Sequence, residues 1–176
     1  MTATQGHASV TKQLIEARCN VDLQMKDGFT PLLFAAQEGH ASVTKQLIAA
    51  RCNIDLQDND GDTPLHMAAQ EGHAAVAKQL IEARCNIDRQ DKDGVTPLHV
   101  AALKGHAAVA QLLLAARCNI DLQTKGGETA LQAAQRVRHP AIATLIRNAK
   151  RTGAVRTMKD TTPRASPEQV KKQQEA

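Results

Sequence analysis

Residues 60–92 read DGDTPLHMAAQEGHAAVAKQLIEARCNIDRQDK. Residues 27–59 match this segment at 25 of 33 positions, and residues 93–125 match it at 23 of 33. A fixed period of this length indicates a repeat architecture, in which each unit buries its apolar side against its neighbours. The chain is therefore predicted to form an elongated stack, and the scarcity of aromatic residues (only Phe29 and Phe34) favours thin layers of aliphatic side chains.

Each unit carries start and stop signals for two short helices. Thr63 suits a helix N-cap, Pro64 suits the first helical turn, and Gly72 suits a helix end. These signals predict one helix over about 64–71, and apolar periodicity predicts a second over about 74–83. The residues that follow, up to the next Asp-Gly pair, predict a projecting loop with a tight turn. Helices shorter than about 12 residues are stable only when they stack on neighbours.

The sequence resembles the ankyrin repeat family through TPLLFAAQEGH at 30–40, TPLHMAAQEGH at 63–73 and TPLHVAALKGH at 96–106. The resemblance implies an all-α fold, an ankyrin-type solenoid of stacked helix-turn-helix units with projecting β-hairpin-like loops. It also implies that His66 and His99 are structural residues, which hydrogen-bond the preceding Thr and the backbone of the neighbouring loop. The histidines of the Gly-His pairs are expected to act likewise.

The repeat divides the chain into six segments. Residues 1–26 are predicted to be a partial first repeat that begins inside its first helix, and 27–59, 60–92 and 93–125 to be full repeats. Residues 126–150 have Ala130, Gln132 and Arg138 at the positions where the other units carry Pro, His and Gly, and they are predicted to be a degenerate C-terminal capping repeat. Residues 151–176 are predicted to be a disordered basic tail, because apolar residues are few there.

Charge and hydropathy exclude several function classes. Residues 1–150 hold 16 basic and 15 acidic residues, so they lack the basic stripe and stacking aromatics of nucleic-acid binders. No apolar run approaches the roughly 18 residues that a membrane span needs, and the start, MTATQGHASV, does not look like a signal peptide. We expect a monomer in the cytoplasm, or alternatively in the nucleus, that does not bind nucleic acid and does not insert into a membrane.

The seven histidines and four cysteines do not predict a metal site. Structural zinc sites gather ligands at short spacings such as Cys-x2-Cys, whereas the cysteines here recur every 33 residues. We therefore expect no metal, no cofactor and buried, reduced thiols. No catalytic residue is predicted either, because each candidate histidine recurs in successive units while a catalytic group is normally singular.

Four arginines occupy a position where ankyrin units usually carry glycine. They are Arg18, Arg51, Arg84 and Arg117, each just after a predicted second helix. The resemblance implies a left-handed backbone there, which costs a residue other than glycine about 1 kcal/mol. Two interpretations stay open: a row of arginines that meets an acidic partner, or the copying of one ancestral unit.

Ankyrin-like stacks bind proteins with their loop tips and the outer face of their first helices, which together line a concave groove. Carried over unit by unit, these positions are Lys26, Asp27, Phe29, Gln37 and Glu38; Asn59, Asp60, Asp62, Gln70 and Glu71; Lys92, Asp93, Val95, Leu103 and Lys104; and Lys125, Glu128 and Arg136. Most differences between units fall here, while the rest of each unit is nearly constant.

The resulting hypothesis is a non-enzymatic protein–protein interaction module, a scaffold or adaptor whose partner the sequence does not identify. Phe29, Val95 and Leu103 are predicted to be apolar anchors on either side of an acidic patch. That patch is expected to comprise Asp60, Asp62 and Glu71, and the basic end beyond it Lys92, Lys104, Lys125 and Arg136. The alternative is a regulatory or structural ankyrin fragment of a longer multidomain protein, such as an enzyme or a channel.

Overall fold

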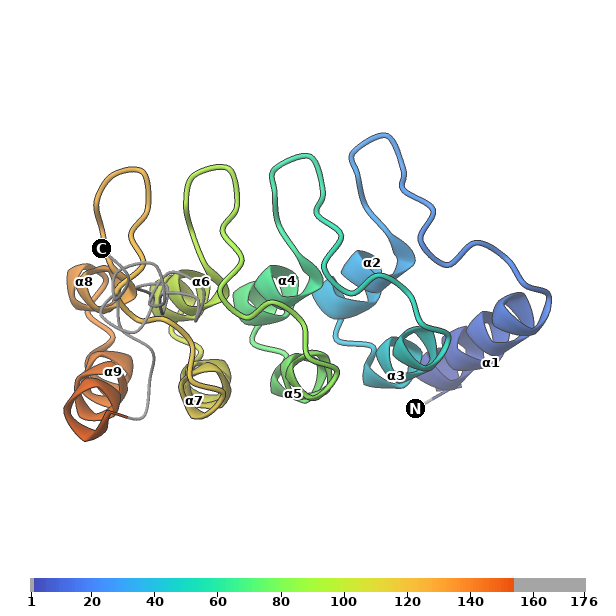
Figure 1. Cartoon of the computed structure of the whole chain (residues 1–176). Coiled ribbons are helices and arrows are strands. Elements are labelled where there is room, and N and C mark those ends of the chain that lie inside the picture. The colour runs from blue at the N-terminus through green and yellow to red at the C-terminus, as the bar shows by residue number, and fades with distance from the viewer. Residues whose placement is uncertain (1, 154–176) are drawn as a thin grey trace, which may run out of the picture.

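The protein, described over residues 2–153 by a computed structural model, is a stack of helix pairs with projecting loops (Figure 1). The described helices are α1 (Thr2–Glu16), α2 (Pro31–Gln37), α3 (Ala41–Ala49), α4 (Pro64–Glu71), α5 (Ala74–Glu82), α6 (Pro97–Lys104), α7 (Ala107–Ala115), α8 (Ala130–Arg136) and α9 (Pro140–Thr152). The first helices α2, α4, α6 and α8 form one row, and α1, α3, α5, α7 and α9 form the other. The predicted all-α solenoid is confirmed. The predicted tail at 151–176 begins too early, because Arg151 and Thr152 are the last residues of α9, and its part from 154 onward lies outside the described residues.

A threonine precedes every first helix and fixes its start. The Thr30 hydroxyl accepts a hydrogen bond from the Leu33 N–H at 3.1 Å, and in the third full unit Thr96 caps α6 in the same way. The predicted helix over 64–71 coincides with α4, and the helix predicted over 74–83 exceeds α5 by one residue. Local capping signals therefore suffice to place these helices.

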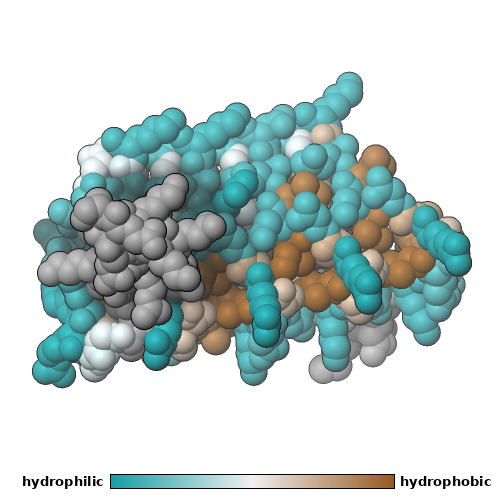
Figure 2. All heavy atoms as spheres, in the orientation of Figure 1, coloured by the Kyte–Doolittle hydropathy of each residue, from teal (hydrophilic) through white to brown (hydrophobic). Residues whose placement is uncertain are grey.

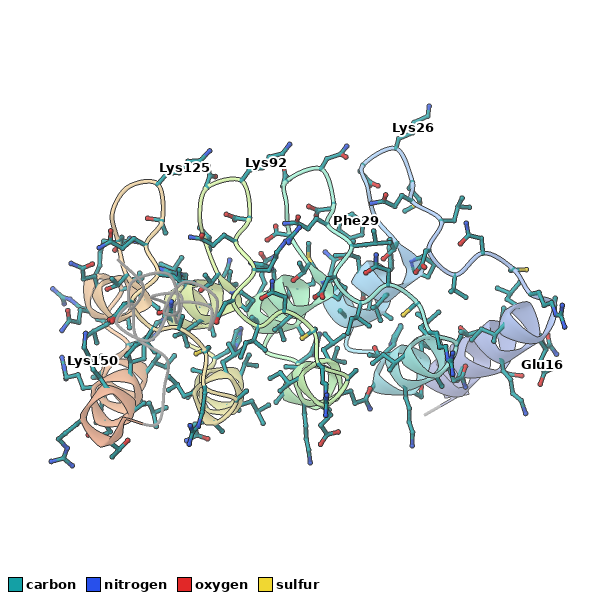
Figure 3. All side chains as sticks on the ribbon, viewed as in Figure 1. Glu16, Lys26, Phe29, Lys92, Lys125 and Lys150 are labelled. Atoms are coloured by element: carbon teal, nitrogen blue, oxygen red, sulfur yellow. The ribbon has the colours of Figure 1, made fainter. Side chains whose placement is uncertain are left out.

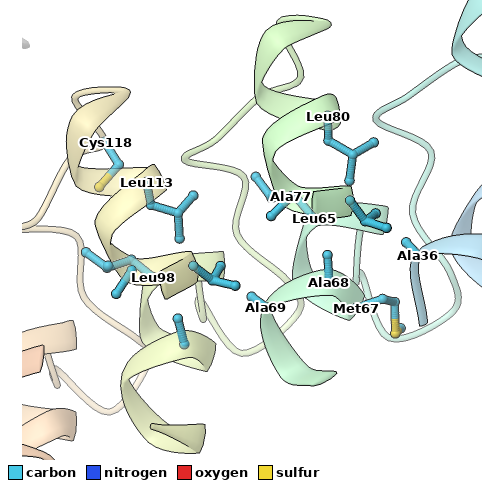
Figure 4. Packing of buried hydrophobic residues seen from close by; sticks show 14 of the residues in the cluster. Ala36, Leu65, Met67, Ala68, Ala69, Ala77, Leu80, Leu98, Leu113 and Cys118 are labelled. Atoms are coloured by element: carbon cyan, nitrogen blue, oxygen red, sulfur yellow. The ribbon is translucent and has the colours of Figure 1, made fainter. Parts of the chain in front are cut away.

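The core is a succession of thin apolar layers, one for each pair of helices. Leu65 of α4 and Leu80 of α5 are both essentially inaccessible to solvent, and Figure 4 shows them packed together with Ala77. Ala68 and Ala69 are fully buried where α4 lies between α2 and α6. Because alanine lets helix axes approach closely, these pairs keep the first helices tightly stacked.

Adjacent loops are joined by backbone hydrogen bonds along the whole stack. The N–H groups of Asn59, Lys92 and Lys125 donate to the carbonyls of Asp27, Asp60 and Asp93 at 3.0, 3.1 and 2.7 Å. The Gln24 amide adds a side-chain bridge, because it donates to both Gly28 O and Gln57 O at 2.9 Å. The loops thus form a continuous ladder, and each loop position has a fixed place relative to the next unit.

Buried histidines connect each unit to its neighbour. The Nδ1 atom of His66 lies 2.8 Å from the Thr63 hydroxyl, and its Nε2 lies 3.1 Å from the Val95 carbonyl of the next loop. His99 repeats both contacts one unit later, which confirms the predicted structural role. Burial lowers the pKa of both histidines, so both rings are neutral at pH 7.

The histidines of the Gly-His pairs connect units in the opposite direction. His73 Nε2 lies 3.0 Å from the Gln37 carbonyl of the preceding unit, and His106 Nε2 lies 3.0 Å from the Gln70 carbonyl. This confirms the expected structural role for these two residues.

Two expectations for the N-terminal segment are wrong. The sequence predicted that this segment begins with the end of a separate first helix. Residues 2–16 instead form one continuous helix, α1, which packs against α3. Cys19 is exposed, whereas Cys52, Cys85 and Cys118 are buried as predicted. The reason is positional, because no described unit precedes Cys19 to cover it. Burial raises the pKa of the Cys52 thiol to about 11 and of the other two buried thiols to about 12, so all three are protonated.

The repeated arginines have the left-handed backbone that the resemblance implies. Their φ angles are 56° at Arg18, 61° at Arg51, 64° at Arg84 and 60° at Arg117. Arg138 has the same conformation, with φ 60°, at the place where earlier units carry the glycine of the Gly-His pair. All five side chains are exposed, so no burial offsets the conformational cost.

We therefore expect Arg84→Gly to raise the free energy of unfolding by about 0.5–1 kcal/mol, because relief of strain exceeds the added freedom of the unfolded chain. Chemical denaturation measures the change, with Arg51→Gly as an independent repeat of the test. An unchanged or lower midpoint in both variants would show that the arginine side chains make stabilising contacts that offset the strain.

Candidate functional site

The loop tips and the exposed ends of the first helices lie along one side of the stack, and we call this side the loop–helix surface. Lys26, Lys92 and Lys125 stand at the outer ends of three loops, while Phe29 lies closer to the helices (Figure 3). The predicted tip residues that are exposed are Lys26, Asp27, Asn59, Asp60, Lys92, Asp93 and Lys125. The loop ladder holds these tips at a regular spacing, so they present one continuous edge.

One position in each loop combines a fixed backbone with a variable side chain. It is occupied by Phe29, Asp62, Val95 and Glu128, all half-buried. Their carbonyls accept the hairpin hydrogen bonds from the N–H groups four residues earlier, at 2.9–3.0 Å. The backbone at this position is therefore the same in every unit, although the side chain is aromatic, acidic, aliphatic and acidic in turn.

The ends of the first helices supply the inner part of the loop–helix surface. Gln37 and Leu103 are half-buried, and Glu38, Gln70, Glu71, Lys104 and Arg136 are exposed. The Gln37 and Gln70 backbone carbonyls accept the histidine contacts from the following unit, so these helix ends are fixed in place. Leu103 is the apolar residue of this set, and it stands where the preceding units carry those two glutamines.

A salt bridge changes the predicted basic end of the surface. The Arg136 guanidinium contacts both carboxylate oxygens of Glu128, at 2.8 and 3.2 Å. The hydrogen bond from Arg136 lowers the pKa of Glu128, so the pair is fully ionised at neutral pH. Arg136 is thus not an open cation as expected, and the basic end consists of Lys92, Lys104 and Lys125. These lysines form no salt bridge with the residues that the structure describes.

Negative charge gathers in the middle of the surface. Asp58 orders this loop, because its Oδ1 accepts hydrogen bonds from the Asp60 and Asp62 N–H groups at 2.9 Å. Burial, followed by the charges of Asp58, Asp91 and Asp60, raises the pKa of Asp62 to about 6. Asp62 is therefore ionised at pH 7 and loses its charge as the pH falls through about 6. The structure adds Asp58 and Asp91 to the acidic patch that the sequence predicted.

Sequence reasoning missed an apolar area at the N-terminal end of this surface. Leu23, Met25 and Phe34 have exposed fractions of 66%, 55% and 50%. Together with Phe29 they line a hollow of about 420 Å³, and the Phe29 and Phe34 rings meet edge to face with centroids 6.0 Å apart. Met25 is the residue whose position in the sequence points to this apolar area, because it stands where the next two units carry Asp58 and Asp91.

Within residues 2–153, no group of three or more His, Cys, Asp or Glu side chains is placed to hold a metal ion. No helix in the same range is long and apolar enough to cross a membrane. The loop–helix surface itself offers fixed shape, charge and apolar contact, which are properties of a binding surface.

Comparison with protein families agrees with this architecture. A model described as ankyrin repeats in three copies matches residues 1–91, and a second, described as ankyrin repeats in many copies, matches residues 80–134. No curated protein sequence matches the chain. Ankyrin repeats generally mediate protein–protein interaction, and their domains are typically non-catalytic. With more than half of its length matched and the helix-turn-helix stack in place, the chain belongs to the ankyrin repeat family.

Proposed function

We propose that this chain is a non-enzymatic scaffold or adaptor module that binds a partner protein through the loop–helix surface. The observation that supports the proposal is the loop position of Phe29, Asp62, Val95 and Glu128. Its backbone hydrogen bond is the same in every unit, but its side chain differs in each unit except for the two carboxylates. A constant backbone that displays varied side chains is suited to the recognition of a partner protein.

The charges and apolar residues of the surface indicate which side chains a partner presents to it. Phe29 and Leu103 are half-buried apolar residues, so their side chains are already partly fixed. A partner can cover them with a small loss of side-chain entropy, which is typical of hot-spot residues. Asp60, Asp62 and Glu71 face the middle of the partner and favour basic residues there. Lys92, Lys104 and Lys125 favour acidic residues toward the other end. The charges raise the association rate, and the apolar contacts set the affinity.

Phe29→Ala and Leu103→Ala are each expected to weaken partner binding by about 1–2 kcal/mol, which is roughly 5- to 30-fold, with an unchanged helical circular dichroism spectrum. The measurement is titration calorimetry with a purified partner recovered by affinity capture on the full chain. Lys45→Ala and Lys78→Ala are the controls, because both residues are exposed on second helices away from this surface.

The opposite pattern would contradict the proposal. If only the control substitutions weakened binding, the partner would contact the second helices α3 and α5, and the loop–helix surface would carry no recognition.

A further inference from the structure

Each of the helices α1, α3, α5 and α7 is followed by the same four residues, Ala-Arg-Cys-Asn. The structure gives the cysteine and the asparagine a role within the stack. The cysteine is buried in all of these units except at Cys19. Asn53 Oδ1 accepts a hydrogen bond from the Asp55 N–H at 3.2 Å, and the other three units repeat this contact. The arginine differs from both, because its backbone is strained and its side chain is exposed.

The strain at this position recurs although glycine would remove it. The chain uses glycine in the turns between paired helices, where Gly39, Gly72 and Gly105 have φ angles of 70°, 77° and 85°. Copying of one ancestral unit accounts for four arginines but leaves their cost unexplained. The exposed position two residues earlier has meanwhile changed from Glu82 to Ala115. Backbone strain that is held without local compensation indicates a functional role.

The strained arginines follow one another along the stack, one in each successive unit. We call these residues the arginine row: Arg18, Arg51, Arg84 and Arg117. In Figure 2, polar side chains stand out one after another over α1, α3 and α5. All four arginine side chains are exposed, and none of them forms a salt bridge within residues 2–153. The row therefore presents unpaired guanidinium groups to solvent.

The carboxylates of the preceding loops are used for another purpose. Asp55 Oδ1 accepts the backbone N–H of Asn86 at 2.8 Å, and the same contact recurs in the units on both sides. These aspartates thus join consecutive loops. Lys150, one repeat after Arg117, shows the contrast, because its ammonium group donates to Asp121 at 2.9 Å. The cation at that place is paired, so the row ends at Arg117.

We propose that the arginine row binds an acidic segment of another polypeptide in the polyproline II conformation, with one carboxylate for each arginine. The planar guanidinium group matches a carboxylate with two parallel hydrogen bonds. Stacked helices lie about 8–10 Å apart, so the arginines recur at about that distance. A polyproline II segment has three residues per turn and rises about 3.1 Å per residue, so every third side chain lies on one side at intervals of about 9 Å. Glutamates at every third position therefore stay in step with the row.

Nucleic acid and membrane surfaces fit the row less well. Single-stranded nucleic acid binds through stacked aromatic rings as well as phosphate contacts. The aromatic residues of this chain, Phe29 and Phe34, instead contact each other in the hollow of the first described loop. A membrane surface favours clusters of basic residues beside apolar residues that insert, whereas the row holds one cation per unit.

The probe is a synthetic, end-blocked and rhodamine-labelled peptide of four Pro-Pro-Glu triplets, titrated with the full chain and followed by fluorescence anisotropy. We expect saturable one-to-one binding in about 50 mM NaCl that weakens at least tenfold in about 300 mM NaCl, because salt screens exposed charges. Arg51→Gly combined with Arg84→Gly is expected to weaken binding at least tenfold. The same double variant is expected to unfold at a higher denaturant concentration, so unfolding cannot account for the loss.

The matched control is Lys45→Gln combined with Lys78→Gln, which removes the same charge from exposed positions on α3 and α5. We expect it to weaken binding of the peptide less than threefold. If this control weakened binding as much as the arginine variant, net charge alone would hold the peptide and the proposal would be wrong.

A second peptide separates matched spacing from general attraction. It has the same prolines and glutamates, but its glutamates stand together at the centre, and we expect it to bind at least fivefold more weakly. Equal or tighter binding of this peptide, no saturation up to about 1 mM, or indifference to the double arginine substitution would overturn the proposal. So would tighter binding of single-stranded DNA or of phosphatidylserine vesicles that the same substitution abolishes, because the row would then bind phosphate groups. These outcomes leave the proposed function untouched, since its test uses Phe29 and Leu103 with a separate partner.

Discussion

Leu80→Ala is expected to lower the free energy of unfolding by about 3–5 kcal/mol, the range typical of leucine truncation at fully buried sites. Leu80 is 0% exposed and packs between α4 and α5 with Leu65 and Ala77. Truncation removes apolar contacts and leaves a cavity, because the short helices on both sides are held by neighbouring units and cannot close over it. Urea denaturation followed by circular dichroism gives the change.

Leu14→Ala is the matched control for this prediction. Leu14 occupies the same place in α1 as Leu80 does in α5, but it is 51% exposed. Its truncation is expected to cost less than about 1 kcal/mol, because half of its surface is already in water. Equal losses from the two substitutions would show that Leu14 is covered as completely as Leu80, and would contradict the difference in burial between α1 and α5.

Gly61→Ala is expected to lower the free energy of unfolding by about 2–3 kcal/mol, through a left-handed residue and a steric clash together. Gly61 has φ 90°, a conformation that alanine adopts only with strain. An added Cβ would lie 2.8 Å from the Lys92 nitrogen of the next loop. This backbone nitrogen also donates to the Asp60 carbonyl, so relief of the clash would stretch a bond of the loop ladder.

Gly127→Ala isolates the two causes. Gly127 has φ 77° and the same place in its unit, but apart from its chain neighbours no described residue has an atom within 4 Å of its Cβ position, because no further loop follows within residues 128–153. We expect a cost of about 1 kcal/mol from backbone strain alone. If thermal unfolding gives the same loss for Gly61→Ala and Gly127→Ala, the loops do not pack as a ladder.

The sequence predicts the inner units well because their signals are local. Thr63, Pro64 and Gly72 stand at the ends of α4, and the structure has that helix at the predicted residues. The helix end at Gly72 is also supported from outside, since the neighbouring residue His73 reaches the Gln37 carbonyl of the preceding unit. Local preference and tertiary contact agree in these units, so pattern reasoning succeeds.

The same signals fail at the N-terminal end, where no unit precedes α1 among the described residues. Gly6 and His7 repeat the Gly-His pair, yet α1 continues through them. Cys19 and Phe34 likewise occupy the same repeat positions as the buried Cys52 and Met67, but both are exposed. The periodic sequence assigns one environment to equivalent residues, whereas burial depends on what lies on either side.

The sequence predicts where the residues of the candidate surface lie along the stack, but not which of their side chains contact one another. The residues at the loop tips and helix ends lie where the repeat register put them, because the register fixes the backbone. The Glu128–Arg136 salt bridge and the contact of Phe29 with Phe34 depend on side chains that meet across a loop and a helix. The separation between the two residues of each pair is not distinctive in the sequence, so the sequence does not predict either contact.

Hydrogen–deuterium exchange on the full chain, with and without a purified partner, tests most directly whether recognition occurs on the loop–helix surface. The account predicts slower exchange in the loops around residues 24–30, 57–63 and 90–96 and at the ends of α2, α4 and α6. Exchange in α3, α5 and α7 should change far less. Slowing confined to those second helices, with the loops unaffected, would contradict the account and move the interaction to the opposite side of the stack.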